Sequence, residues 1–305
     1  MESRTSIVAV AGGTGFVGGA IARELATRGH KVIVLSHRKT SGDSSPTIEY
    51  RPADVTRPAS LITALVGVDT LVISLAFRNS PVEAPRRGQT FEAVDAAGTE
   101  ALVAAAVKAG VRRLVYMSGA GAAPDAQRHW FRAKWRAEES VRGSGIVYTI
   151  FRPSWIYGPG DKSLNRFLGF ARWLPFIPQI GNGRQVLVPI LVSDVAALVA
   201  DALETPAAEN VTFEVGGPEE LTMDEIVRAA LRASGRRRPI LHSPAALMKL
   251  AMRPLTLLPA PPMTPDAIDF VVASAPVDTD LLRQRLPRRL TPLAEGLATY
   301  LSPRH

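Results

Sequence analysis

The chain has 305 residues and contains no cysteine. This absence excludes disulfide bonds, thiolate metal sites and a cysteine nucleophile, and it is consistent with a cytoplasmic protein. No stretch reaches the ~20 apolar residues that a membrane-spanning helix needs. The first apolar run, "SIVAVAGG" at 6–13, is too short for a signal peptide. Histidines and acidic residues nowhere show metal-ligand spacing, so we expect no metal site.

Lysine is also scarce, since all but six of the 36 basic residues are arginines. The formal net charge of +8 could indicate a nucleic acid, an anionic lipid or a phosphorylated ligand as a partner. The arginines are scattered, however, and often share helices with glutamates. The densest runs, "SGRRRP" at 234–239 and "RQRLPRRL" at 283–290, are short. We therefore attribute most of the charge to solvated faces and do not expect a nucleic-acid partner.

Apolar runs alternate with alanine-rich helical runs up to about residue 155. Short runs rich in β-branched residues predict strands at 6–11, 31–36, 47–52, 69–76, 113–118 and 147–154. Helical periodicity predicts helices at 15–29, 59–67, 94–110 and 129–145. Strands that are apolar almost throughout, and are separated by helices, indicate a parallel sheet covered on both faces. The expected fold class is therefore α/β, with a Rossmann-type doubly wound parallel sheet in residues 1–155.

The pattern changes after this point, where prolines become dense. A further strand is predicted at 211–217, and helices are predicted at 193–204, 222–234, 243–253 and 291–301. We expect residues 156–305 to form a small C-terminal α-rich region that adds to the sheet and closes its ligand-binding edge. Its apolar stretches, 171–183 and 243–262, are typical of packed core. A lid, a partner surface and a shallow membrane contact are the alternatives.

A glycine turn joins the first predicted strand to the first helix. Gly12, Gly15 and Gly18 stand in a G-x-x-G-x-x-G arrangement. In this context the first glycine permits a tight turn, the second lets the backbone approach a pyrophosphate, and the third allows close packing of helix on strand. The helix N-terminus supplies N–H groups and a positive dipole end for the phosphates. The other turn residues expected to line this dinucleotide site are Thr14, Phe16 and Val17.

The second strand ends in "LSHRK" at 35–39. A site that prefers NAD typically has an aspartate or glutamate here, for the ribose 2′-hydroxyl, whereas this chain has His37 and Arg38. A guanidinium suits the 2′-phosphate of NADP, so we favour NADP(H) over NAD(H), with a solvated strand end as the alternative. Asp54 could accept a hydrogen bond from adenine or be an ordinary acidic residue at a helix start. The apolar residues expected beside the cofactor, or in the strand core, are Val55, Leu75 and Ala76.

Further segments carry a resemblance to a known family. "AGVRRLVYMSGAGA" at 109–122, "IFRPSWIYGPGD" at 150–161 and "VPILVSDVAALVADALE" at 188–204 follow the glycine turn in order. Together they resemble the short-chain dehydrogenase/reductase superfamily, in its extended or atypical branch. The resemblance implies that Arg152 and Pro153 belong to a loop around the nicotinamide and the substrate. Arg152 could equally hold the strand end by pairing with a carboxylate.

Active members of this superfamily use a Tyr-x-x-x-Lys pair on one helical face, with a serine or threonine at the preceding strand end. In "HWFRAKWRAEE" at 129–139 the lysine is Lys134, which the resemblance implies binds the nicotinamide ribose, but Trp130 stands at the tyrosine position. An indole can donate a hydrogen bond but cannot act as a general acid near neutral pH. Ser118 is the candidate for the serine, although "GAGA" follows it where a hydroxyl is expected. Candidate substitute proton donors are Tyr116 and Tyr157, although a tyrosine near a strand end or in a Tyr-Gly-Pro turn is usually packing, and His129, which lies five residues from Lys134 and so roughly 140° off its helical face.

Residues 129–161 are similar to one subgroup, which contains the NADPH-binding accessory subunit of respiratory complex I and its bacterial relatives. This similarity implies nucleotide binding more directly than turnover. We therefore expect an NADP(H)-binding protein with a degenerate catalytic site, associated with a protein complex or with the inner face of a membrane. Two alternatives stay open: an active NADP-dependent reductase or epimerase with a displaced proton donor, and a regulator that senses NADP(H).

Overall fold

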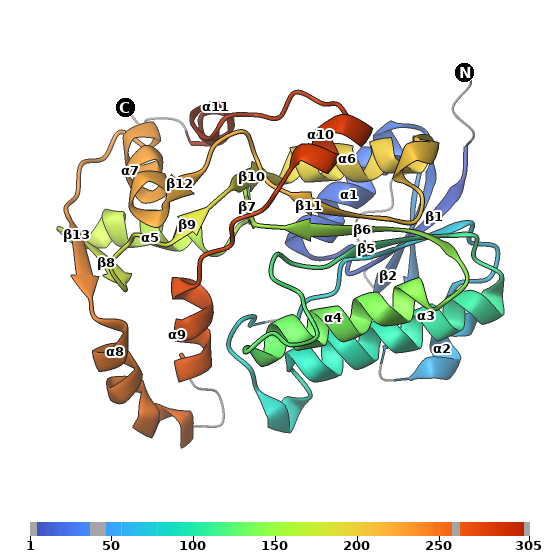
Figure 1. Ribbon diagram of the computed structural model, residues 1–305, viewed down its shortest axis with the longest axis horizontal. Helices are drawn as coiled ribbons and strands as arrows, with labels where there is room; N and C mark the ends of the chain where they lie inside the picture. Colours follow the sequence, from blue (N-terminus) through green and yellow to red (C-terminus); the bar gives the residue numbers. More distant parts are fainter. Residues whose placement is uncertain (1–4, 37–46, 56, 78, 258–262, 302–305) are drawn as a thin grey trace.

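The computed structural model describes residues 5–36, 47–55, 57–77, 79–257 and 263–301. A parallel sheet of seven strands, in the order β11-β6-β5-β4-β1-β2-β3, forms the larger part of the molecule (Figure 1). The order changes direction between the neighbours β1 and β4, and ligands of such sheets bind at the carboxyl ends of the strands there. The strands are β1 (Ile7–Ala11), β2 (Lys31–Ser36), β3 (Ile48–Pro52), β4 (Thr70–Ile73), β5 (Arg113–Met117), β6 (Val147–Pro153) and β11 (Val211–Val215).

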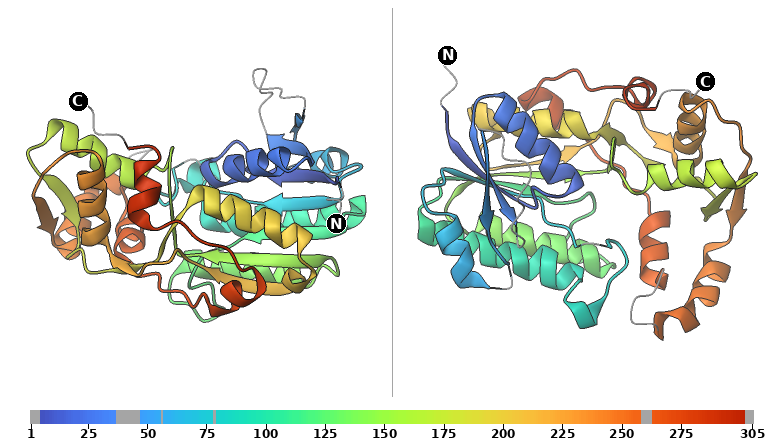
Figure 2. Two further views of the ribbon diagram at one scale, coloured as in Figure 1. Left: turned by 90° about the horizontal axis from the view of Figure 1, so that it is seen from above. Right: turned by 180° about the vertical axis from the view of Figure 1, so that it is seen from behind.

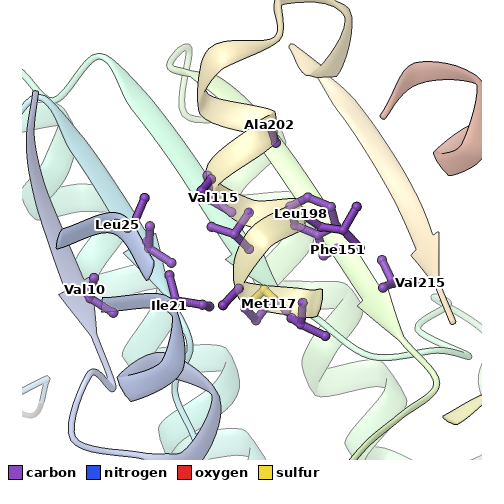
Figure 3. Close-up of a cluster of buried hydrophobic side chains, with 14 of the residues drawn as sticks. Val10, Ile21, Leu25, Val115, Met117, Phe151, Leu198, Ala202 and Val215 are labelled. Atoms are coloured by element: carbon purple, nitrogen blue, oxygen red, sulfur yellow. The ribbon is translucent and has the colours of Figure 1, made fainter. Parts of the chain in front are cut away.

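Helices cover both faces of this sheet. One face carries α1 (Phe16–Thr27) and α6 (Val192–Glu204), and the other carries α2 (Pro58–Ala64), α3 (Gly98–Ala109) and α4 (His129–Arg142). Alternate side chains of β1 therefore enter different cores. Val8 and Val10 join the core beneath α1 and α6, part of which Figure 3 shows, whereas Ala9 and Ala11 join the opposite core. The predicted doubly wound α/β fold is confirmed.

The chain returns to the sheet after it has left β6. Helix α6 packs on α1, where the Arg28 guanidinium donates to Asp201 at 2.7 Å. Strand β11 then pairs with β6 along five residues. The C-terminal half of the chain thus supplies one strand and one helix of the larger part before it completes the smaller region.

The smaller region lies beside the sheet, as both views in Figure 2 show. Its own apolar core is built mainly from α5, α7 and α11. Its helices are α5 (Leu164–Trp173), α7 (Met223–Ala233), α8 (Ala245–Met252), α9 (Pro265–Val272) and α11 (Leu293–Ala298), and α10 (Asp280–Arg285) lies near β11. Three two-stranded sheets pair β7 (Trp155–Tyr157) with β10 (Pro189–Leu191), β9 (Val186–Leu187) with β12 (Leu221–Thr222), and β8 (Ile177–Ile180) with β13 (Ile240–Ser243).

The structure differs from the predicted secondary structure in two respects. The helix predicted over 94–110 is divided into a π-helical segment, η2 (Phe91–Ala97), and α3. The Thr90 hydroxyl caps η2 by accepting from the Ala93 N–H at 3.0 Å, so the helical path begins earlier than periodicity indicated. The sequence did not predict α5, α9, α10 or the short strands of the smaller region. None of the helices in the described ranges has both the length and the apolar character to cross a membrane.

Candidate functional site

The glycine turn lies at the carboxyl end of β1 and touches the end of β4. Gly12 has a φ of +83°, and a Cβ built on it would lie 2.1 Å from the carbonyl oxygen of Ser74. A Cβ on Gly18, inside α1, would lie 2.3 Å from the carbonyl oxygen of Gly12. Both positions require glycine, because backbone atoms already occupy the space of a side chain. The turn is therefore pressed against β4, and α1 is packed directly on the turn.

The N-terminus of α1 is open to an anion. Gly15 precedes the helix with extended backbone angles, and no side chain caps the helix or places an acidic group in its first turn. Thr14 and Gly15 are exposed, while Phe16 and Val17 are half-buried. The first N–H groups of a helix have no partner within it and lie at the positive end of the dipole. This end of α1 could therefore hold the pyrophosphate of a dinucleotide.

Apolar residues expected beside the cofactor meet at the start of α3. A Cβ on Gly98 would lie 3.3 Å from a methyl group of Val55 and 3.3 Å from one of Leu75. Ala76 follows and is exposed. On the other side of the turn, a Cβ on Gly160 would lie 3.7 Å from the Phe16 ring, so the loop after β7 reaches the glycine turn. Residues that follow β3 and β4 in the large sheet, and β7 in the smaller region, thus lie along one edge of the large sheet.

The groups expected to distinguish NADP from NAD follow β2. His37 and Arg38 lie outside the described residues. Asp54 follows β3, and its side chain, which is 35% exposed, has its carboxylate 3.8 Å from the Arg57 guanidinium. The backbone N–H of Asp54 donates to the Ser60 hydroxyl at 3.2 Å, which fixes the loop that leads into α2. A partly exposed carboxylate at this strand end could accept a hydrogen bond from an adenine amino group.

Lys134 is held at the end of β5 by two oxygen atoms. Its Nζ lies 2.7 Å from an oxygen of Asp95, which belongs to η2, and it donates to the carbonyl oxygen of Met117 at 3.2 Å. The Asp95 side chain is 4% exposed. Burial lowers the pKa of Lys134, but Asp95 and Tyr116 outweigh this effect and raise it above the ordinary value. The ammonium is therefore charged at neutral pH.

Trp130 is buried one helical turn before Lys134. It is 3% exposed, and its ring centroid lies 5.5 Å from that of Phe270 in α9 and 6.2 Å from that of Phe91 in η2. The Arg128 guanidinium lies 5.8 Å from the indole centroid. Among the described residues, no group accepts a hydrogen bond from the indole N–H. The indole nitrogen is itself buried, and an indole N–H cannot transfer a proton near neutral pH.

Ser118 and Arg152 meet on a buried carboxylate. The Ser118 hydroxyl donates to Glu138 at 2.5 Å, and Arg152 donates to both oxygens of Glu138, at 2.8 and 2.6 Å. Arg142 donates to the same carboxylate at 2.6 Å. Glu138 has no exposed surface, so this cluster ties the ends of β5 and β6 to α4. Arg152 thus pairs with a carboxylate, which is one of its two expected roles, and the Ser118 hydroxyl is engaged in the same cluster.

Pro153 ends β6 and is buried. Its carbonyl oxygen accepts the N–H of Ala120 at 3.0 Å, so the loop after β5 is fixed to the end of β6. The loop therefore lies along the same edge of the sheet as the glycine turn, because the strands are parallel. Within the described ranges, no three acidic or histidine side chains converge in the manner of a metal site.

The substitute proton donors differ in exposure. Tyr116 is 1% exposed, and burial raises its pKa to about 12. Tyr157 is completely buried in the core of the smaller region, where a Cβ on Gly296 would lie 2.1 Å from its hydroxyl. The His129 ring lies 2.9 Å from Glu83, and its side chain is 38% exposed. Of these three groups, His129 is the one that solvent reaches.

Three residues of this region were missed by the sequence reasoning. Glu138 stands on the same helical face as Trp130 and Lys134, and a charged residue on a buried face is a signal that it has a partner. Asp95 lies in an alanine-rich helical run, where one acidic residue is not distinctive. Phe270 belongs to a helix that the sequence did not predict, so no signal placed it beside Trp130.

The chain is similar to known proteins over most of its length. Residues 12–206 match the model of a protein family described as NAD(P)H-binding. The chain is 32% identical to the mitochondrial NADH dehydrogenase (ubiquinone) 1 alpha subcomplex subunit 9 of Arabidopsis thaliana, over 74% of this chain and 57% of that protein. It is 27% identical to the NAD(P)H azoreductase of Xenophilus azovorans, over 89% of this chain and 88% of that protein.

Among solved structures, the UDP-glucose 4-epimerase of Thermotoga maritima has a TM-score of 0.75 and 18% identity over 97% of both chains, which is a likeness in fold. The chain spans little more than half the length of the Arabidopsis subunit, 57%. Together, these matches confirm the expected resemblance to the complex I subunit and to the epimerase-like fold.

Proposed function

Because this chain belongs to the NAD(P)H-binding family, we propose that it holds NADP(H) at the carboxyl edge of its sheet and catalyses little or no alcohol–ketone turnover. The open N-terminus of α1 would hold the pyrophosphate, Val55 and Leu75 would border the adenosine, and Lys134 would donate to the nicotinamide ribose. The observation that carries the proposal is Trp130, an indole buried among aromatic rings at the position where active members have their acid.

The chemistry of the site supports binding over turnover. When bound, the nicotinamide supplies or accepts a hydride; the protein residues bind it, orient it and exclude water. Carbonyl reduction also needs a proton at the substrate oxygen, and a positioned acid contributes roughly 10²- to 10⁴-fold to such reactions. Trp130 cannot provide that proton. Tyr116 is buried, with a pKa of about 12, and the Ser118 hydroxyl already donates its hydrogen bond to Glu138.

Two other functions have an observation in their favour. An active NADP-dependent reductase or epimerase with a displaced donor is favoured by His129, which is partly exposed and paired with Glu83 next to Trp130. A regulator that senses NADP(H) is favoured by the contact between Trp130 and Phe270, because it links the edge of the sheet to a helix of the smaller region.

A protein partner or a membrane surface is part of the proposal. The Arabidopsis relative is by its name a subunit of an NADH dehydrogenase, and this supports membership of a protein complex. We infer that the apolar segments of the smaller region provide the contact, at the periphery of the complex or of the membrane.

Cofactor preference gives the first test. NADPH is expected to bind about 10- to 100-fold more tightly than NADH, since a hydrogen bond to a charged group contributes about 1.5–3 kcal/mol. Arg38→Ala should remove most of this preference. Arg57→Ala changes a guanidinium that is 81% exposed beside Asp54, and it should leave the ratio unchanged. Titrations that follow nucleotide fluorescence measure the dissociation constants of NADPH and NADH for each protein. Tighter binding of NADH than of NADPH by the unaltered protein would contradict the expected preference.

Turnover gives the second test. NADPH oxidation with ketones, quinones and sugar nucleotides is expected to be about two to four orders of magnitude slower than in an enzyme with a positioned acid. Trp130→Tyr restores a phenol four residues before Lys134 and should raise the residual rate, whereas Trp130→Phe should not. Rates are followed by the loss of NADPH absorbance. Steady, fast oxidation by the unaltered protein would favour the displaced-donor alternative instead.

A further inference from the structure

A cavity of about 330 Å³ opens at the C-terminal end of α7, and five of the seven residues that line it are arginines. They come from α7 and from the loop that follows it. The arginines are Arg228, Arg232, Arg236, Arg237 and Arg238. Guanidinium groups bind phosphate oxygens through charge-assisted, often bidentate hydrogen bonds. The arginines of this wall could therefore bind a phosphate beside an apolar floor that includes Leu231 and Pro239, and none of these residues belongs to the glycine turn or to the surroundings of Lys134.

Protein groups cancel little of this charge. Arg228 pairs with Asp224 at 2.7 Å. No other carboxylate of the described residues lies within ion-pair distance of the five arginines. Arg238 donates to the backbone carbonyl oxygen of Leu174 at 3.1 Å, which holds its side chain without removing its charge. The wall therefore has an excess of positive charge that an anionic ligand would balance.

Large apolar side chains are exposed on the adjoining elements. Trp173 precedes Leu174 at the end of α5 and is 85% exposed, and Leu241 on β13 is 55% exposed. Helix α8 follows β13, has no buried side chain among its residues, and leaves Leu247 and Leu250 each 63% exposed. Figure 1 shows α7, β13 and α8 in succession along one side of the molecule, and the view from behind in Figure 2 agrees. Grouped exposure of this kind marks an interaction surface.

We propose that this side of the molecule is a peripheral binding site for anionic phospholipids. Headgroup phosphates enter the arginine-lined cavity, while Trp173, Leu241 and the leucines of α8 enter the boundary between headgroups and acyl chains. The site deepens the proposed contact through the smaller region and is independent of the nucleotide site. Free phosphate would need the arginines but not the exposed leucines. A nucleic acid would likewise leave the aliphatic side chains in water, so the combination favours a lipid.

Co-sedimentation with vesicles tests the proposal on the full chain. Binding is expected to vesicles of phosphatidylcholine with about a third phosphatidylglycerol, and it should weaken as salt screens the charges. Arg232→Gln with Arg237→Gln changes two arginines whose side chains make no hydrogen bond or ion pair with the described residues, and should lower the partition coefficient about 10- to 30-fold. Leu247→Ser with Leu250→Ser should also lower it. Arg283→Gln with Arg285→Gln, on the distant helix α10, is the matched control and should bind as the unaltered protein does.

Four outcomes would overturn the proposal: no sedimentation with anionic vesicles at low salt, equal sedimentation with phosphatidylcholine alone, an equal loss in the α10 control, or arginine-dependent binding to inorganic phosphate or duplex DNA that excludes vesicles. NADPH affinity is measured on the same samples without vesicles. If the unaltered protein binds NADPH but not vesicles, the lipid site alone is overturned. If it binds vesicles but not NADPH, the result counts against the proposed function alone.

Discussion

Gly12→Ala is expected to destabilise the protein by at least about 4 kcal/mol and to abolish nucleotide binding, because the new methyl group would collide with backbone and not with a side chain that could move. Its Cβ would lie 2.1 Å from the Ser74 carbonyl oxygen, at a φ of +83°. To relieve this clash, the glycine turn must move away from β4. The movement displaces the N-terminus of α1, which is proposed to bind the pyrophosphate. Urea denaturation and an NADPH titration measure the two effects.

Gly29→Ala is the matched control for this substitution. Gly29 has a φ of +86° but no atom within 4 Å of its would-be Cβ. It should therefore show only the cost of the left-handed backbone, about 1–2 kcal/mol, with NADPH affinity unchanged. Equal losses of stability in the two variants would mean that the contact with Ser74 is not what requires glycine at position 12.

The second large effect is expected at Glu138. Glu138→Ala leaves the Arg142 and Arg152 guanidinium groups without their shared carboxylate, and breaking a buried ion pair in this way costs about 3–5 kcal/mol. The Ser118 hydroxyl loses its acceptor as well. The ends of β5 and β6 are then no longer tied to α4. The free energy of unfolding from urea titrations gives the loss, provided that the denaturant dependence is unchanged.

The neighbouring glutamate offers a close comparison. Glu139 bonds the same Arg142 at 2.7 Å, but its side chain is 55% exposed. Glu139→Ala should cost no more than about 1 kcal/mol, as is usual for exposed ion pairs. Glu138→Gln keeps the shape of the side chain and removes only its charge, so it should fall between the two alanine variants. A Glu138→Ala variant as stable as Glu139→Ala would show that the cluster contributes nothing beyond a surface pair.

Much of the fold could be predicted because its signals are local and repeated. Most strands of the large sheet are short apolar runs, β3 with its Glu49 and Arg51 being an exception, and glycine stops end periodic helices, so most of β1 to β6 and α1 to α4 follow from composition and spacing. The smaller region gives weaker signals. Its strands are as short as two residues, in β9 and β12, and are fixed by pairing with distant segments. α9 and α10 are only eight and six residues long, which is too short for periodicity to be informative.

The candidate site shows the same division between local and distant information. The glycine turn and the Trp130–Lys134 pair lie within single segments, so the sequence displays them directly. The partners that position them come from elsewhere: Asp95 from η2 and Phe270 from α9. Such contacts depend on how helices pack across the sheet, and no local pattern encodes them. A single sequence can therefore name the groups of a site before it can say which of them are restrained.

The return of the chain to the sheet through α6 and β11 has a consequence for how the molecule can come apart. A polypeptide that alternates between two regions has no single point at which it can be divided, because a cut after β6 would leave that strand without β11, one of its two neighbours, and α1 without its cover α6. The two regions should therefore melt together as one cooperative unit. A nucleotide that binds at the edge of the sheet would then protect even the remote helices against proteolysis, although it touches none of them.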